Sequence, residues 1–201
     1  MDLHEIRKKL KKELDKGRYE HTKGVMYTAG CLAMAHEYDT GDAMLAGLLH
    51  DCAKCIPNEK KIELCRRHEI PVTEVEYKSP YLLHAKLGAY LAETEYGVKS
   101  PVICHAIRVH TTGAPDMSVL EKILYIADYI EPGRDKAPNL SYVRTLAFRD
   151  LNACMAEILR DTLKYLSGRG GPIDPLTKMT YDYYRPYLVS ENKSLEGRED
   201  S

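Results

Sequence analysis

Four histidines and two aspartates occupy positions from which several helices could contribute side chains to one metal site. They stand within or at the ends of five apolar segments: His21, the adjacent pair His50 and Asp51, His84, His110 and Asp128. A single histidine on a helix is more often a surface residue or a hydrogen-bonded core residue than a ligand. Six such residues at the ends of different apolar helices favour a common site in a bundle core.

Asp128 is the least expected of the six, because it lies within the apolar stretch "ILYIADYI". A carboxylate left without a partner in such surroundings costs several kcal/mol. A metal cation would neutralise it directly. A buried salt bridge to Arg134 or Arg144 is the alternative that the sequence leaves open.

The types of donor restrict the metal. Imidazole nitrogen with carboxylate oxygen suits iron, manganese, cobalt, nickel or zinc, and the set contains no thiolate of the kind found in closed structural zinc sites. Cys52 and Cys55 form a CxxC pair beside Asp51, but a thioredoxin-type motif needs a strand before its helix, and a zinc site needs a second pair. We interpret the two cysteines as incidental and leave a redox-sensing role as the alternative.

The elements that must position these residues are predicted to be helices. Apolar residues recur at helical spacing in seven segments: 21–38, 42–53, 59–68, 82–96, 101–110, 118–131 and 141–166. Ser118 and Glu121 form a capping box, and Gly97 and Gly113 suit positions of positive φ at helix ends. With no alternating β pattern, we predict one all-α domain of six to eight helices over residues 1–188. The polar tail 189–201 is expected to be disordered.

Composition excludes several classes of protein. The net charge is −1, which gives no electrostatic footprint for nucleic acid. The charged N-terminal residues lack the apolar region of a signal peptide, and no apolar run reaches the roughly 18 residues that span a membrane. We therefore expect a cytoplasmic protein with no nucleic-acid or membrane partner. The sequence leaves a homodimer open.

The order of the six residues, H…HD…H…H…D, resembles the HD-domain superfamily of metal-dependent phosphohydrolases. The stretches "RYEHTKGV", "AGLLHDCAK", "LLHAKLGA", "AIRVHTTG" and "ILYIADYIEPGR" look like its YqeK branch, over residues 5–185. The resemblance implies an HD-type helical bundle and symmetrical cleavage of dinucleoside tetraphosphates, with diadenosine tetraphosphate giving two ADP. It also implies two divalent metals, iron first, with His21, His50, Asp51 and Asp128 on one ion and Asp51 bridging to a second on His84 and His110. A metal-bound hydroxide would attack phosphorus.

The residues around this pattern could bind the phosphates. Lys54 lies about one helical turn beyond Asp51, and the fork of Arg134 suits bidentate phosphate contact. Thr111 and Thr112 follow His110 and could donate from their hydroxyls. The candidate catalytic residues are therefore Asp51, Lys54 and Arg134, and the candidate substrate contacts are Lys54, Thr111, Thr112 and Arg134. Lys54 could instead be a solvated surface residue, and Arg134 could pair with Glu131 or Asp135.

Two departures from the family pattern bear on this interpretation. Cys52 replaces an expected aliphatic residue, which does not affect metal binding, and "DKAPNL" after Arg134 lacks an expected aromatic residue, which concerns substrate preference. Two other functions remain open. One is a di-iron oxygenase using the same ligands, and the other is a nucleotide-sensing module without turnover.

Overall fold

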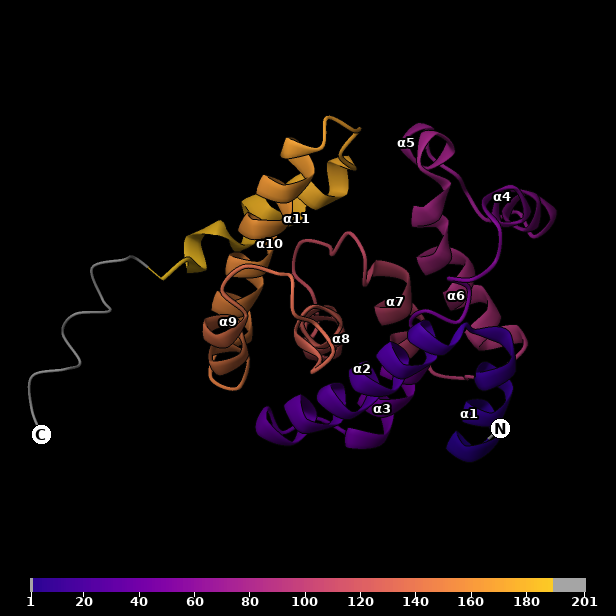
Figure 1. Ribbon diagram of the computed structural model, residues 1–201, viewed down its shortest axis with the longest axis horizontal. Coiled ribbons are helices and arrows are strands. Elements are labelled where there is room, and N and C mark those ends of the chain that lie inside the picture. The colour runs from indigo at the N-terminus through magenta and orange to yellow at the C-terminus, as the bar shows by residue number, and fades with distance from the viewer. Residues whose placement is uncertain (1, 190–201) are drawn as a thin grey trace, which may run out of the picture.

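A computed structural model describes residues 2–189, and every regular element within them is a helix. Figure 1 shows the arrangement, with α1 and α4–α6 at one end of the molecule and α9–α11 at the other. The α-helices are α1 Leu3–Glu13, α2 Lys16–Ala35, α3 Thr40–Leu49, α4 Asn58–Arg67, α5 Glu74–Lys78, α6 Leu83–Thr94, α7 Pro101–Val109, α8 Val119–Ile130, α9 Leu140–Ala147, α10 Leu151–Gly168 and α11 Pro175–Tyr184. Two short 3₁₀ helices, η1 Pro80–Leu82 and η2 Arg185–Tyr187, complete the described elements.

Helices α2 and α3 form a closely packed pair at the base of the molecule (Figure 1). The apolar face predicted for α2 is confirmed, because Val25, Ala29 and Leu32 are fully buried. The two helices approach each other at Gly47, where a Cβ atom would lie 2.8 Å from the Cα of Met26. Only glycine fits so close to a neighbouring backbone. This contact sets the end of α3, and therefore His50, against α2.

Helix α8 lies at the centre of the fold and packs against α2, α3, α7 and α10. Its capping box is formed as predicted, with Ser118 and Glu121 each bonded to the other's backbone amide. Leu120, Ile123 and Leu124 are fully buried. Asp128 lies on the last turn of this helix, and its side chain is one-quarter exposed.

The all-α class is confirmed, but the predicted number of six to eight helices was too low, since residues 2–189 contain eleven α-helices. The predicted long helix 141–166 is two helices, α9 and α10. The chain breaks after Ala147, and the carboxylate of Asp150 accepts the backbone N–H groups of Asn152 and Ala153 to start α10. Helices α1, α5 and α11 were not predicted. The predicted polar tail lies, apart from Val189, outside the described residues.

None of the helices in the described part of the chain is both long enough and apolar enough to cross a membrane.

Candidate metal centre

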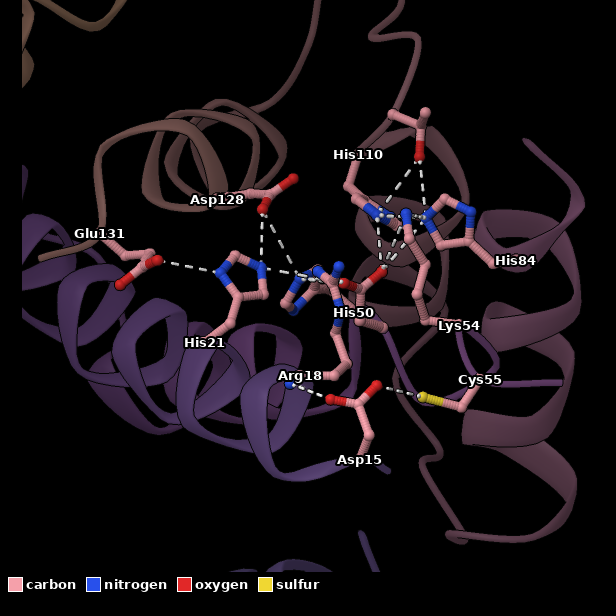
Figure 2. Close-up of polar contacts among 12 residues, drawn as sticks. Asp15, Arg18, His21, His50, Lys54, Cys55, His84, His110, Asp128 and Glu131 are labelled. Carbon is pink, nitrogen blue, oxygen red and sulfur yellow. Dashed lines mark hydrogen bonds and ion pairs between the residues drawn. The ribbon is translucent and has the colours of Figure 1, made fainter. Parts of the chain in front are cut away.

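The fold brings the six predicted ligands together from five segments (Figure 2). His21 lies on the second turn of α2, and Asp128 lies on the last turn of α8. His50 and His110 are the C-cap residues of α3 and α7, while His84 lies on the first turn of α6. The termini of these helices converge, so the predicted convergence of the six side chains is observed.

Asp51 stands between two groups of histidines. Its Oδ2 lies 3.3 Å from Nε2 of His50 and 3.8 Å from Nε2 of His21. Its Oδ1 lies 3.2 Å from Nε2 of His84 and 3.8 Å from Nε2 of His110. One carboxylate therefore faces a different histidine pair with each oxygen, which is the arrangement that a bridging ligand requires.

Asp128 completes the group around His21 and His50. Its Oδ1 lies 3.0 Å from Nε2 of His21 and 3.8 Å from Nε2 of His50. The side chain is one-quarter exposed, whereas Asp51 is 2% exposed. The centre therefore has a buried floor at Asp51 and an edge at Asp128 that solvent can reach.

All four histidines present the same nitrogen to the centre. The Nδ1 atoms of His50, His84 and His110 lie 2.5–2.7 Å from the backbone carbonyl oxygens of Gly47, Tyr81 and Ile107. His21 places Nδ1 3.0 Å from the carboxylate of Glu131. Because carbonyl and carboxylate oxygens can only accept a hydrogen bond, Nδ1 carries the proton in each ring. The Nε2 atoms of all four rings therefore point inward, toward the carboxylates of Asp51 and Asp128, as potential metal ligands.

These donors fit a divalent metal. Among the described residues, Nε2 of His21, Nε2 of His50 and Oδ1 of Asp51 are buried without a hydrogen-bond partner. The Nε2 atoms of His84 and His110 lie 3.2 Å apart with their lone pairs toward each other. Buried polar atoms are nearly always partnered, and facing lone pairs repel. A cation would satisfy both conditions, and the nitrogen and oxygen donors suit a first-row transition metal.

The electrostatics of the site keep Asp51 and His110 in the forms that bind cations. Burial alone would raise the pKa of Asp51, but His50, His84 and Lys54 hold it well below its ordinary value. Burial and the neighbouring His84 and His50 lower the pKa of His110 to about 3. The ionised Asp51 and the neutral His110 are in the states that metal coordination needs. Burial alone would lower the pKa of His50, but Asp51 and Asp128 raise it.

Two basic residues lie at the rim of the centre. The Nζ atom of Lys54 is 3.1 Å from Nε2 of His84 and 3.7 Å from Oδ1 of Asp51. Arg134 donates from Nη2 to Oδ1 of Asp128 at 2.7 Å and from Nε to the Asp128 carbonyl at 2.9 Å. The salt bridge left open in the sequence is thus formed by Arg134, which lies 4.0 Å from Glu131. Arg144 instead donates to backbone carbonyls.

The two threonines differ in position. The hydroxyl of Thr111 lies 3.3 Å from Nε2 of both His84 and His110. Thr112 donates to the Gly113 carbonyl at 3.1 Å and lines a separate cavity of about 370 Å³, which Thr111 also borders. Of the four predicted substrate contacts, Lys54, Thr111 and Arg134 therefore surround the metal centre and Thr112 does not.

A cavity of about 440 Å³ opens over the centre. It is lined by Lys54, His84, His110, Thr111, Tyr125, Asp128, Tyr129, Gly133, Arg134, Asp135, Lys136, Ala137 and Thr162. A second cavity of about 600 Å³ shares Tyr129, Arg134 and Lys136 with the first and extends toward Tyr165 on α10. The centre therefore lies at the end of a groove with basic and tyrosine side chains along it.

Comparison with known proteins identifies this arrangement. The sequence matches the HD domain over residues 18–133, a range that contains all six candidate ligands. The chain belongs to the HD domain family. A bis(5'-nucleosyl)-tetraphosphatase, symmetrical, of Bacillus subtilis (strain 168) is 40% identical over 174 residues, covering 87% of this chain and 92% of the relative. A protein of the same description from Halalkalibacterium halodurans is 40% identical over 173 residues, covering 86% and 91%.

A solved structure shows the same HD fold. It is a predicted HD superfamily hydrolase involved in NAD metabolism from Clostridium acetobutylicum, 39% identical to this chain, with a TM-score of 0.89. The match covers 92% of this chain and 98% of that chain. The resemblance inferred from the ordered histidines and aspartates is confirmed at the level of the family.

The HD centre includes two side chains that the sequence did not reveal as part of the site. Arg18 donates from Nη1 to Oδ2 of Asp51 at 2.7 Å, and Glu131 accepts from His21. Arg18 lies three residues before His21 on α2, so helical spacing places both on one face and could have indicated it. Glu131 follows α8 across a change of backbone direction, and no local pattern predicts where its side chain points.

Cys52 and Cys55, which follow Asp51, have separate hydrogen-bond partners and border one cavity of about 490 Å³. Cys52 is buried, its Sγ is 3.5 Å from the Gly88 carbonyl, and burial raises the pKa of its thiol well above the ordinary value. The exposed Cys55 donates to Asp15 at 3.4 Å. All six cysteines are unpaired by disulfides. The two thiols have different partners, which fits the interpretation of the CxxC pair as incidental.

Proposed function

We propose that this chain is a metal-dependent phosphohydrolase that cleaves dinucleoside tetraphosphates symmetrically, converting diadenosine tetraphosphate into two ADP. The observation that carries the proposal is the position of Asp51, whose two oxygens face two separate histidine pairs. Relatives that match most of the chain are described as symmetrical bis(5'-nucleosyl)-tetraphosphatases, which supports the choice of substrate.

The ligand set that we assign has two parts. His21, His50, Asp51 and Asp128 would hold one divalent ion, and Asp51 with His84 and His110 would hold a second. Iron is our first choice, with manganese, cobalt, nickel or zinc compatible with the same donors. When bound, such ions lower the pKa of coordinated water and offset charge on phosphoryl oxygens. The inward Nε2 atoms and the ionised Asp51 support this assignment.

The chain's own basic residues would hold the polyphosphate. Hydrolysis adds water to one of the two central phosphorus atoms and breaks the central P–O–P bridge, so that each half leaves as ADP and protons pass to solvent. Negative charge builds on the phosphoryl and leaving oxygens during this step. Lys54 and Arg134 at the rim are placed to counter that charge, and Thr111 can donate a hydrogen bond. We assign catalytic roles to Asp51, Lys54 and Arg134.

The shape of the groove supports a long substrate. The second cavity, which shares Arg134 and Lys136 with the first, offers tyrosine rings at Tyr129 and Tyr165 against which a nucleoside can pack. A smaller cavity, which shares Thr111 with the first, is bordered by Thr112. We therefore keep Thr112 as a proposed contact for the distal part of the substrate, away from the metals.

Product analysis tests the proposal. We expect purified protein to contain a transition metal by elemental analysis, at up to two ions per chain, and to release only ADP from diadenosine tetraphosphate when manganese, cobalt or iron is supplied. ATP with AMP as products would contradict symmetrical cleavage. Oxygen consumption with an organic substrate would support a di-iron oxygenase instead, and tight nucleotide binding without ADP release would support a sensing module.

A further inference from the structure

Glu131 is a buried carboxylate whose two oxygens have two different partners. Its side chain is 5% exposed. Oε1 lies 3.0 Å from Nδ1 of His21 on α2, and Oε2 accepts the backbone N–H of Gly133 at 2.6 Å. Figure 2 shows Glu131 on the far side of His21 from the other histidines. One side chain thus joins a candidate metal ligand to the turn that follows α8.

The space around this carboxylate is fitted to it. A Cβ atom at Gly24, one helical turn after His21, would lie 2.5 Å from Oε2 of Glu131. A Cβ atom at Gly133 would lie 3.0 Å from both oxygens. Glycine at these two positions leaves the room that Glu131 occupies, because any side chain there would push the carboxylate away from His21.

The turn that Glu131 stabilises carries Arg134. The N–H of Arg134 donates to the Glu131 carbonyl at 2.9 Å. The guanidinium of Arg144 donates to the carbonyls of Ile130, Glu131 and Arg134 at 2.9–3.0 Å. The backbone from 130 to 134 is therefore held from both sides, by Arg144 outside and by the Glu131 carboxylate inside.

We propose that Glu131 is a positioning residue that acts on both halves of the site, orienting His21 toward the metal and fixing the turn that presents Arg134 to the substrate phosphates. This inference rests on the proposed function, since it takes His21 as a ligand and Arg134 as a phosphate contact. A carboxylate behind a histidine fixes the ring's tautomer and orientation. Here the second oxygen of the same carboxylate also accepts a hydrogen bond from the turn that carries Arg134.

The chemistry of glutamine separates the two roles. A peptide N–H can only donate, so in a Glu131→Gln variant the amide oxygen must face Gly133. The amide NH₂ would then face Nδ1 of His21, which can accept only if the ring proton moves to Nε2. The nitrogen that faces Asp51 and Asp128 would be protonated and unable to bind a metal. Glu131→Gln therefore removes the first role and keeps the second, whereas Glu131→Ala removes both.

The experiment measures metal and anion binding separately. We expect Glu131→Gln to weaken Mn²⁺ binding, measured by calorimetry, by about 10–100-fold, the usual effect of losing the partner of a ligating histidine. Its affinity for ADP in the presence of EDTA should stay within about twofold of wild type. Glu131→Ala should lose Mn²⁺ affinity and also bind ADP about fivefold more weakly, because the turn has lost a hydrogen bond.

Glu121 supplies the matched control. At the other end of α8 it is also buried, with Oε1 2.6 Å from Nδ1 of His105 and Oε2 accepting the N–H of Ser118 at 2.8 Å. Glu121→Gln should leave both Mn²⁺ and ADP affinity unchanged. Gly24→Ala is a second probe that leaves Glu131 in place but displaces its carboxylate, and it should weaken Mn²⁺ binding while favouring helix α2.

A ¹⁵N spectrum of the metal-free protein at mildly alkaline pH tests the tautomer directly. The His21 proton should be on Nδ1 in wild type and on Nε2 in Glu131→Gln, with the resonance assigned from a His21→Gln variant. An unchanged tautomer, or Mn²⁺ affinity within about twofold of wild type in both Glu131→Gln and Gly24→Ala, would overturn the inference. A wild-type protein that binds no Mn²⁺ would remove the proposed function, whereas the tautomer would still decide the role of Glu131.

Discussion

The contacts of Asp51 at the centre need its negative charge and both of its carboxylate oxygens. It is almost fully buried, and it is held by Arg18 on one oxygen and by Lys54 near the other. Both cationic side chains contact the carboxylate, and the histidine Nε2 atoms still face its two oxygens. The site is therefore preorganised, because the carboxylate is already ionised and oriented before a metal arrives.

Replacing Asp51 by Asn keeps the volume of the side chain and removes its charge. We expect metal content and ADP release to be lost together. The loss should exceed the roughly 100-fold caused by mutating a residue that only hydrogen-bonds to a metal ligand. Elemental analysis and product assays on the same preparation measure both. Asp42→Asn, on the first turn of α3, the helix that ends just before His50 and Asp51, should change neither. Full turnover by Asp51→Asn would remove Asp51 from the mechanism.

Arg134 tests the phosphate contact without removing a candidate ligand, although it pairs with one of them, Asp128. Arg134→Lys keeps a positive charge but loses the fork that bonds two oxygens at once. We expect kcat/KM to fall about tenfold, equivalent to about 1.4 kcal/mol, with metal content unchanged. Arg160→Lys is the control, because Arg160 is similarly exposed and also pairs with a carboxylate, that of Glu157. A loss of metal with Arg134→Lys would assign the residue to the metal site instead.

Residue types and order were enough to predict the six candidate ligands, whereas the residues that support them could not be predicted. The ligands stand out because a charged or polar side chain in an apolar helix needs a reason to be buried. Glu131 and Arg18 stand in polar stretches, where an acid or a base is expected on any surface. Their roles depend on which way a side chain turns, and that is fixed only by the packing of α2 against α8.

At the scale of helices, the apolar period predicts where a helix runs better than where it ends. The pattern of 141–166 continues across Phe148, Arg149 and Asp150, but the chain turns there. The N–H groups of Arg149 and Asp150 both bond the Leu146 carbonyl, which closes α9. Asp150 then caps α10. Whether a helix ends at such a place depends on the small difference in free energy between forming a cap and adding one more helical turn. The spacing of apolar residues does not reveal that difference.

The contact between α2 and α3 at Gly47 sets the distance between His21 and His50. In Gly47→Ala the new Cβ would meet backbone atoms of Met26, which cannot rotate away. We expect the helices to separate, with a loss of about 1–3 kcal/mol in the free energy of unfolding and weaker Mn²⁺ binding. Chemical denaturation and calorimetry measure the two effects.

Gly88→Ala on α6 is the matched substitution, because a Cβ there would meet no atom closer than 3.5 Å. It should retain Mn²⁺ affinity and be neutral or stabilising by up to about 1 kcal/mol, the difference in helix propensity. Equal metal affinity in both alanine variants would mean that the close approach of α2 and α3 does not control the centre.

For the molecule as a whole, the centre is where segments distant in sequence meet. Its six candidate ligands come from α2, the end of α3, α6, α7 and α8, so a bound metal would hold five segments that unfolding must separate. In the described chain the two carboxylates also pair with Arg18, Lys54 and Arg134, and the helices that carry the six residues pack against one another. Metal binding should therefore stabilise an already folded bundle and not create the fold.

Thermal unfolding can measure this linkage. A ligand that binds only the folded state at 100 times its dissociation constant adds about 2.7 kcal/mol. For a chain of this size we expect Mn²⁺ at that concentration to raise Tm by about 5–10 °C and excess EDTA to reverse the rise. The metal-free protein should still unfold cooperatively. Asp51→Asn should unfold at the same Tm with and without Mn²⁺, and an equal rise in that variant would locate the stabilising metal elsewhere in the molecule.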